Sequence, residues 1–163
     1  MPVQMYSLAD FTVELATTGG APATVEASCV AGTLSYDVET NYVTPPATAC
    51  DPFPAMQNRG TRRSVTLEGV ADEAEATSVV DFLEDHSGQA GTITLEPIAA
   101  KAALLPTIVF PVAGFVEASI AYPADDTATI STEAMYLTGR PTRTPAAALV
   151  AAAAGAAGDV DDA

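Results

Sequence analysis

Basic residues are scarce in this sequence of 163 residues: six lysines and arginines stand against 21 acidic residues, a formal net charge of −15. Proteins that bind nucleic acid through its phosphates need a basic surface, and anionic lipid surfaces also attract basic residues. The composition therefore argues against both kinds of partner. Two interpretations of the acidity remain open. It keeps an apolar-rich chain soluble, or it keeps the protein from adhering to a nearby polyanion.

Cysteine and long apolar runs are also scarce. Cys29 and Cys50 are the two cysteines, and one pair does not make the disulfide framework of a small secreted domain. No stretch approaches the ~18 consecutive apolar residues of a membrane helix. The first ten residues are mixed and acidic, so we expect no secretory signal and synthesis in a reducing cytoplasm.

The sequence contains no set of residues with the spacing of a known catalytic motif. The sequence has no nucleophile elbow and no glycine-rich phosphate loop. Cys29, Cys50 and His86 lack the spacing of a zinc site, and Asp125-Asp126 lacks that of a calcium loop. His86, the only histidine, is expected to satisfy the last carbonyls of a helix. We therefore predict a protein without enzymatic activity, cofactor or metal.

Alternation of apolar and polar residues, typical of strands with one buried face, dominates the first part of the chain. Turn residues such as Gly19-Gly20 separate the alternating runs. The spacing of the runs predicts an antiparallel β-sandwich or barrel. The predicted strands are Asp10–Ala16, Ala23–Ala31, Thr33–Glu39, Ser64–Val70 and Gly91–Pro97.

Two longer alternating segments follow. Thr107–Tyr122 places apolar residues at even positions, and Thr127–Gly139 comes after Pro123-Ala124-Asp125-Asp126, which has turn chemistry. We predict one long hairpin over residues 107–139, with arms of about 13–16 residues against the usual ~5–6. A hairpin of that length is expected where a sheet extends beyond one chain.

One amphipathic helix is predicted over residues 72–86. Asp72 suits the N-cap, and Glu75 completes a capping-box-like pair. One face carries an apolar stripe typical of a helix packed on a sheet. The stripe consists of Ala76, Val79, Val80, Phe82 and Leu83. The opposite face carries Asp81, Glu84 and Asp85. These acids are either solvated or placed to meet an arginine-bearing loop of a neighbouring subunit.

The segment Thr40–Arg63 lacks any alternation. Its four prolines exclude a helix interior and a central strand, and its length exceeds the ~12–15 residues beyond which loops are usually functional or disordered. Both readings stay open: a disordered segment, or a loop that becomes ordered against a partner subunit. The candidate contact residues of this loop are Tyr42, Phe53, Met56, Arg59, Arg62 and Arg63.

Three regions follow from these patterns. Residues 1–9 are predicted to be an N-terminal arm, residues 10–139 the β domain, and residues 140–163 an alanine-rich, acidic tail that we expect to be mobile.

The order of elements over roughly residues 10–140 resembles that of the major tail tube proteins of long-tailed bacteriophages and, more loosely, the tube proteins of type VI secretion systems. The resemblance rests on the N-terminal strands, the long proline-containing loop, one short helix and the long hairpin. The local strings that support it are Val65–Gly69, Thr92–Leu95, Gly114–Glu117 and Leu137–Pro141. It implies a β-sandwich or barrel with a flanking helix. In the family, six copies form a ring whose long strands join into an inner barrel, and stacked rings make a tube through which DNA leaves.

The resemblance further implies a structural virion protein, assembled in the cytoplasm of a bacterial host, with no cofactor and no membrane. Its partners would be copies of itself and the tape measure, tail terminator and baseplate or tip proteins. DNA would pass an acidic lumen without specific binding. The residues implied to face the lumen are Glu117, Ser119, Thr127, Thr129, Ser131 and Glu133. The loop residues and helix acids given above would make the inter-subunit contacts.

Two other interpretations remain open. The first is another non-enzymatic virion protein, such as a capsid decoration or tail completion factor, which stops at trimers or single rings. The second is an extracellular ligand-binding β-sandwich, which would need a signal peptide, surface aromatic residues and a Cys29–Cys50 disulfide.

Overall fold

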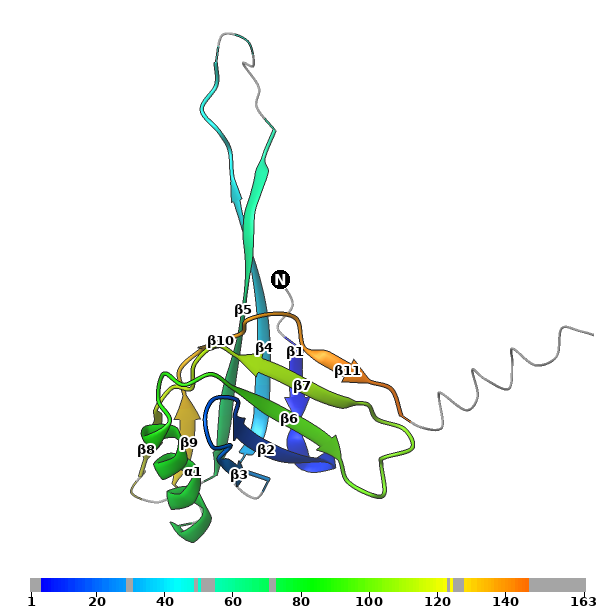
Figure 1. Cartoon of the computed structure of the whole chain (residues 1–163), viewed down its shortest axis with the longest axis vertical. Helices are drawn as coiled ribbons and strands as arrows, with labels where there is room; N and C mark the ends of the chain where they lie inside the picture. Colours follow the sequence, from blue (N-terminus) through cyan, green and yellow to red (C-terminus); the bar gives the residue numbers. More distant parts are fainter. Residues whose placement is uncertain are drawn as a thin grey trace, which may run out of the picture.

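The chain folds into two antiparallel β-sheets and one α-helix. The computed structural model describes residues 4–28, 31–48, 50, 55–70, 73–122, 124 and 128–146. This part contains eleven β-strands, the helix and one short 3-10 helix. The predicted fold class, mainly β with a single helix and sandwich-like sheets, is confirmed. In the described part the sheets remain two separate layers and do not close into a barrel (Figure 1).

Sheet A has the strand order β1-β4-β5-β9-β8, and β10 also pairs with β5. Its strands are β1 (Gln4–Ser7), β4 (Ala31–Val43), β5 (Gln57–Val70), β8 (Ala118–Ala121), β9 (Thr129–Thr132) and β10 (Met135–Tyr136). Residues 4–7, inside the predicted N-terminal arm, thus form an edge strand on β4.

Sheet B has the strand order β11-β7-β6-β2-β3. Its strands are β2 (Phe11–Thr17), β3 (Thr24–Glu26), β6 (Gly91–Pro97), β7 (Thr107–Val112) and β11 (Thr142–Thr144). The short 3-10 helix Leu8–Asp10 carries the chain from sheet A to sheet B. β11 belongs to the predicted tail, whose residues 147–163 lie outside the described residues.

Alternate residues of both sheets meet in one apolar core, as expected for two facing sheets. Leu34 lies opposite Leu67 in sheet A, and Ile93 lies opposite Phe110 in sheet B. All four side chains are buried. The ring centroids of Tyr36 in sheet A and Phe110 in sheet B are 5.8 Å apart, so aromatic contact joins the two layers.

The helix α1 spans Glu73–Asp85, so the prediction of one helix in this region is confirmed. It packs against β3 of sheet B and β8 of sheet A. The side chains of Val79, Phe82 and Leu83 are buried, which agrees with the predicted apolar stripe, and Phe82 meets Phe115 edge-to-face at 5.6 Å. The helix covers one end of the sandwich, on the side away from the projecting strands (Figure 1).

The prediction of one long hairpin over residues 107–139 is wrong. β7 pairs with β6 in sheet B, whereas β8 pairs with β9 in sheet A, so the chain changes sheets between them. Backbone bonds hold the intervening segment against the turn after α1: Phe115 N–H donates to Gln89 O at 3.0 Å, and Gly88 N–H donates to Phe115 O at 2.9 Å. Alternation persists across this break because β7 and β8 both turn their even positions towards the core.

The long hairpin of this protein is β4–β5, and the prediction of a segment without strands over residues 40–63 is therefore also wrong. The two strands pair from Ala31 opposite Gly69 to Val43 opposite Gln57. Residues 40–43 and 57–63 are strand, and the described residues between them, 44–48, 50, 55 and 56, belong to no strand. Figure 1 shows the hairpin extending well beyond the two-sheet body.

Candidate assembly surfaces

The outer part of the β4–β5 hairpin, residues 38–63, is named the arm below. β1 pairs with β4 only as far as Tyr36, and β10 pairs with β5 only as far as Ser64. Among the described strands, none flanks the ladder beyond these points except for one bond from Leu137 N–H to Arg63 O. Six residues of β4, Val38 to Val43, extend past the body, about 20 Å at ~3.3 Å per residue.

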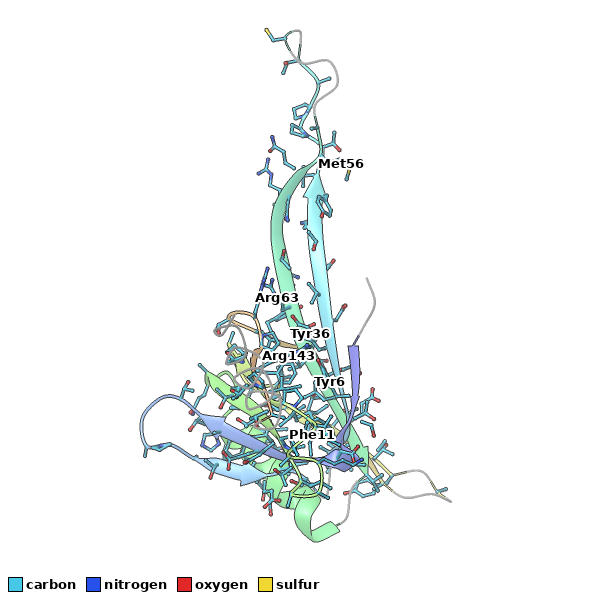
Figure 2. The ribbon with its side chains drawn as sticks, turned by 90° about the vertical axis from the view of Figure 1, so that its right-hand side faces the viewer. Tyr6, Phe11, Tyr36, Met56, Arg63 and Arg143 are labelled. Atoms are coloured by element: carbon cyan, nitrogen blue, oxygen red, sulfur yellow. The ribbon has the colours of Figure 1, made fainter. Side chains whose placement is uncertain are left out.

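Apolar side chains of the arm are exposed near its far end. The exposed fractions are 52% for Tyr42, 38% for Val43 and 66% for Met56. Figure 2 shows Met56 far out on the arm and Arg63 nearer the body. An isolated two-stranded hairpin is marginally stable in water, and grouped exposed apolar residues mark interaction sites. The arm therefore has the composition of a contact element.

The arm also gathers half of the basic residues of the chain, Arg59, Arg62 and Arg63. The guanidinium carbon of Arg62 lies 5.2 Å from the ring centroid of Tyr136, a cation–π contact that joins the arm to β10. Together with Glu39 and other residues, the three arginines line an open hollow of about 420 Å³. This hollow presents basic groups at the base of an arm on an otherwise acidic chain.

The ladder of the arm contains a bulge at Gly60. The register shifts between Asn41 and Tyr42, and Gly60 has φ +144°, a backbone conformation open almost only to glycine. Gly60 N–H donates to Asn58 Oδ1 at 2.8 Å. Because a bulge bends the strand that carries it, Gly60 sets the direction of the outer arm.

Most of the candidate contact residues, which were predicted to lie in a loop, lie on this arm. Tyr42, Met56, Arg59 and Arg62 are exposed there and Arg63 is half-buried, whereas Phe53 lies outside the described residues. The second group, Asp81, Glu84 and Asp85, is exposed on α1, whose last turn carries no basic residue. Within one chain the structure does not bring these acids to the arm.

The outer face of sheet A, opposite the core, is polar. In register, Ser35 lies opposite Thr66, and Glu68 lies opposite Ser131, which lies opposite Ser119. The hydroxyl groups of Ser119 and Ser131 are 3.2 Å apart. The odd positions of β4 and the even positions of β5 thus continue the polar face of β8 and β9 across the sheet.

Part of the predicted lumen set lies on this face. Ser119, Thr129 and Ser131 are exposed there, and Glu117 and Glu133 are exposed just beyond the ends of β8 and β9. Thr127 lies outside the described residues. Ser35, Asp37, Thr66 and Glu68 on β4 and β5 share this face and were not in the predicted set. The sequence does indicate a polar face on β4, because Thr33, Ser35 and Asp37 alternate with apolar residues. The pattern does not show that β5 lies beside β9 in the same sheet.

Two further features of the described part bear on function. No helix there is long and apolar enough to cross a membrane, and no group of three or more His, Cys, Asp or Glu side chains there is placed to hold a metal ion. Cys50 is exposed as a free thiol, and Cys29 lies outside the described residues.

Comparison with solved structures finds chains of similar fold. No protein-family model matches the chain, and no curated protein matches it. A solved chain described as "Virion of native gene transfer agent (GTA) particle" is similar over 83% of this chain and 96% of that chain, at 14% identity and a TM-score of 0.46. An identity and a TM-score of this size are too low to assign this chain a family or a function.

Proposed function

We propose that this protein is the structural subunit of a phage-type tail tube, in which rings of subunits stack into a hollow tube that conducts DNA. Ring formation follows from the resemblance described for the sequence, and six copies per ring is the number in that family. The observation that carries the proposal is the arm. It projects past its own fold and exposes both backbone edges together with apolar side chains.

The arm needs a partner for a physical reason. Unpaired strand edges are templates for further pairing, and proteins normally shorten, charge or cover them. Here β4 and β5 extend for six or more residues with no flanking strand among those described. A neighbouring copy would pair with these edges or cover them. Pairing would join the sheets of separate subunits, and no free edge would remain.

The outer face of sheet A is proposed to line the lumen. Within the body it carries Asp37 and Glu68 among serines and threonines, with Glu117 and Glu133 at its margin. DNA binds proteins chiefly by releasing counterions to basic groups. A polar, acidic wall therefore repels the phosphates and lets the polymer move along the tube without being held.

In this proposal the protein resides in the virion and is assembled in the host cytoplasm. Its partners are further copies of itself and the proteins that start, measure and end a tail. The acids Asp81, Glu84 and Asp85 of α1 are exposed on the body and are available for contacts between neighbouring subunits.

Electron microscopy of the purified chain tests the proposal. The wild-type protein is expected to form rings and hollow tubes when concentrated. In a matched variant, Asn-Gly replaces residues 44–56. Because Val43 lies opposite Gln57, this two-residue turn closes the ladder and removes only the end of the arm.

We expect the Asn-Gly variant to keep the circular dichroism spectrum and melting temperature of the wild type but to form no tubes. Tubes of normal length from this variant would contradict the role of the arm. A wild-type protein that stops at trimers or single rings would instead favour a decoration or completion protein.

A further inference from the structure

We propose that the arm of one copy docks on the opposite end of the body of the next copy, where β5, β8 and β9 meet. This inference rests on the proposed tube function and names the surface that receives the arm. The receiving surface, named the base patch, consists of Val70, Ala121, Tyr122 and Thr129.

The base patch is fixed by strand register. Val70 at the end of β5 lies opposite Thr129 at the start of β9, and Thr129 lies opposite Ala121 at the end of β8. All three are exposed, so they form a row across three adjacent strands. Tyr122 follows directly. Val70 is 50% exposed on this face, and Tyr122, the residue after β8, is 74% exposed at the same end of the sheet. Exposed apolar residues at one end of a sheet are candidates for a contact surface.

The arm and the base patch lie at opposite ends of one strand. β5 begins in the arm at Gln57 and ends in the base patch at Val70 (Figure 1). Its 14 residues span about 45 Å at ~3.3 Å per residue. A contact between two different patches at opposite ends of a subunit is heterologous, and such contacts propagate into open stacks instead of closing in a dimer.

The chemistry of the two surfaces is complementary. The arm offers Tyr42, Val43 and Met56, which are exposed, together with Arg59, which follows the register partner of Tyr42, Asn58. The base patch offers Val70 and Tyr122 with Glu68, which is exposed two residues before Val70 on the same face of β5. Four further acids come within four residues after Val70 or Tyr122 in the sequence. They are Asp72 and Glu73 after Val70, and Asp125 and Asp126 after Tyr122.

This combination selects a second copy as the occupant. The base patch needs a ligand that is both apolar and basic, and a phosphate polymer is neither. The arm, residues 38–63, holds three of the six basic residues but two of the 21 acids, Glu39 and Asp51. Among the described residues, the arm joins this positive charge to exposed apolar side chains.

Photo-crosslinking in the full chain tests the docking. Benzoylphenylalanine is placed at Met56, which is 66% exposed, and in a control at Leu104, which is 69% exposed on the connection between β6 and β7. Each variant is mixed with heavy-nitrogen-labelled wild-type protein, assembled and illuminated. Mass spectrometry then identifies the linked peptide, and the label identifies links between copies.

We expect the probe at Met56 to link to the peptide of another copy that contains Val70 or Tyr122, and the probe at Leu104 not to link there. Links from Met56 to the arm of a second copy, or to a different surface in assembled tubes, overturn the docking and leave the tube function standing. If the wild-type chain forms no ring or tube and the link is absent, both proposals fail.

A paired variant gives a second readout. Val70→Ser with Tyr122→Ser changes only exposed residues, so folding is expected to persist. Loss of an aromatic contact at the centre of an interface is expected to raise the concentration needed for tube growth about tenfold or more. The control Leu104→Ser is expected to assemble normally. Normal assembly of the paired variant contradicts the docking.

Discussion

Gly91 shows how a single residue positions the helix against the sandwich. It is buried at the start of β6, and a Cβ atom there would fall inside van der Waals contact with the ring of Phe115 and the carbonyl oxygen of Ala16. Phe115 in turn packs on Phe82 of α1. The missing side chain of Gly91 therefore makes room for the aromatic contact that holds the helix.

Gly91→Ala is expected to lower the free energy of unfolding by about 1–3 kcal/mol, the usual cost of overpacking, because the backbone carbonyl of Ala16 cannot move aside. Urea unfolding followed by circular dichroism measures the change. Gly139→Ala is the control, since a Cβ atom at Gly139 meets nothing within 4 Å. Equal unfolding midpoints for the two variants would refute this account of Gly91.

The residues of the candidate surfaces were partly readable from the sequence. The apolar and basic residues between 40 and 63 were predicted to be contact residues because no periodic pattern assigned them to a buried face. Ser119 and Ser131 were placed on the polar face because each alternates with a core residue. Glu68 was missed, since its place beside Ser131 depends on pairing between strands that are more than 60 residues apart.

At the scale of the element, the arm depends on its bulge. Gly60→Ala is expected to force the backbone out of φ +144° and so to redirect the outer arm and abolish tubes. No atom lies within 4 Å of an added Cβ atom, so the effect is not steric. Electron microscopy and thermal melting measure assembly and folding.

The control for Gly60 is Gly20→Ala, because Gly20 also has a positive φ, +74°, and an open surrounding but lies in the turn between β2 and β3. Alanine at Gly20 also carries a backbone cost, since its φ is positive, and this variant is expected still to assemble. If the two variants assemble equally well, the bulge does not direct the arm.

Elements with a buried face were predictable, and their partners were not. The helix and the strand Gly91–Pro97 follow directly from their patterns. The segment 107–122 was predicted as one strand because its alternation is continuous. Alternation indicates which side chains are buried, but it does not indicate to which sheet a strand belongs. The arm was not predicted as strand because both of its faces are exposed, and its sequence therefore shows no apolar–polar alternation. Pairing between the two backbones does not require such alternation.

At the scale of the whole molecule, the sign of the lumen charge is the property to change. Asp37→Lys, Glu117→Lys and Glu133→Lys together are expected to leave tubes assembled but to make them retain DNA, with an affinity that falls steeply as salt rises. Retained DNA inside a lumen would resist nuclease.

The matched control places three lysines on α1 at Asp81, Glu84 and Asp85. The change in net charge is the same, but DNA bound on that exposed helix would be digested. This control also reads out assembly, because these acids are candidate contacts. Nuclease-sensitive DNA on both tubes would contradict the assignment of the lumen to the outer face of sheet A.

β5 runs without interruption from the arm to the base patch, and this has a mechanical consequence for the proposed tube. Tension along a stack of such subunits would travel through the covalent backbone of one strand. It would load the β4–β5 ladder in shear, so that many hydrogen bonds resist together instead of opening one after another. Such a filament would resist stretching while its ring-to-ring contacts allow it to bend.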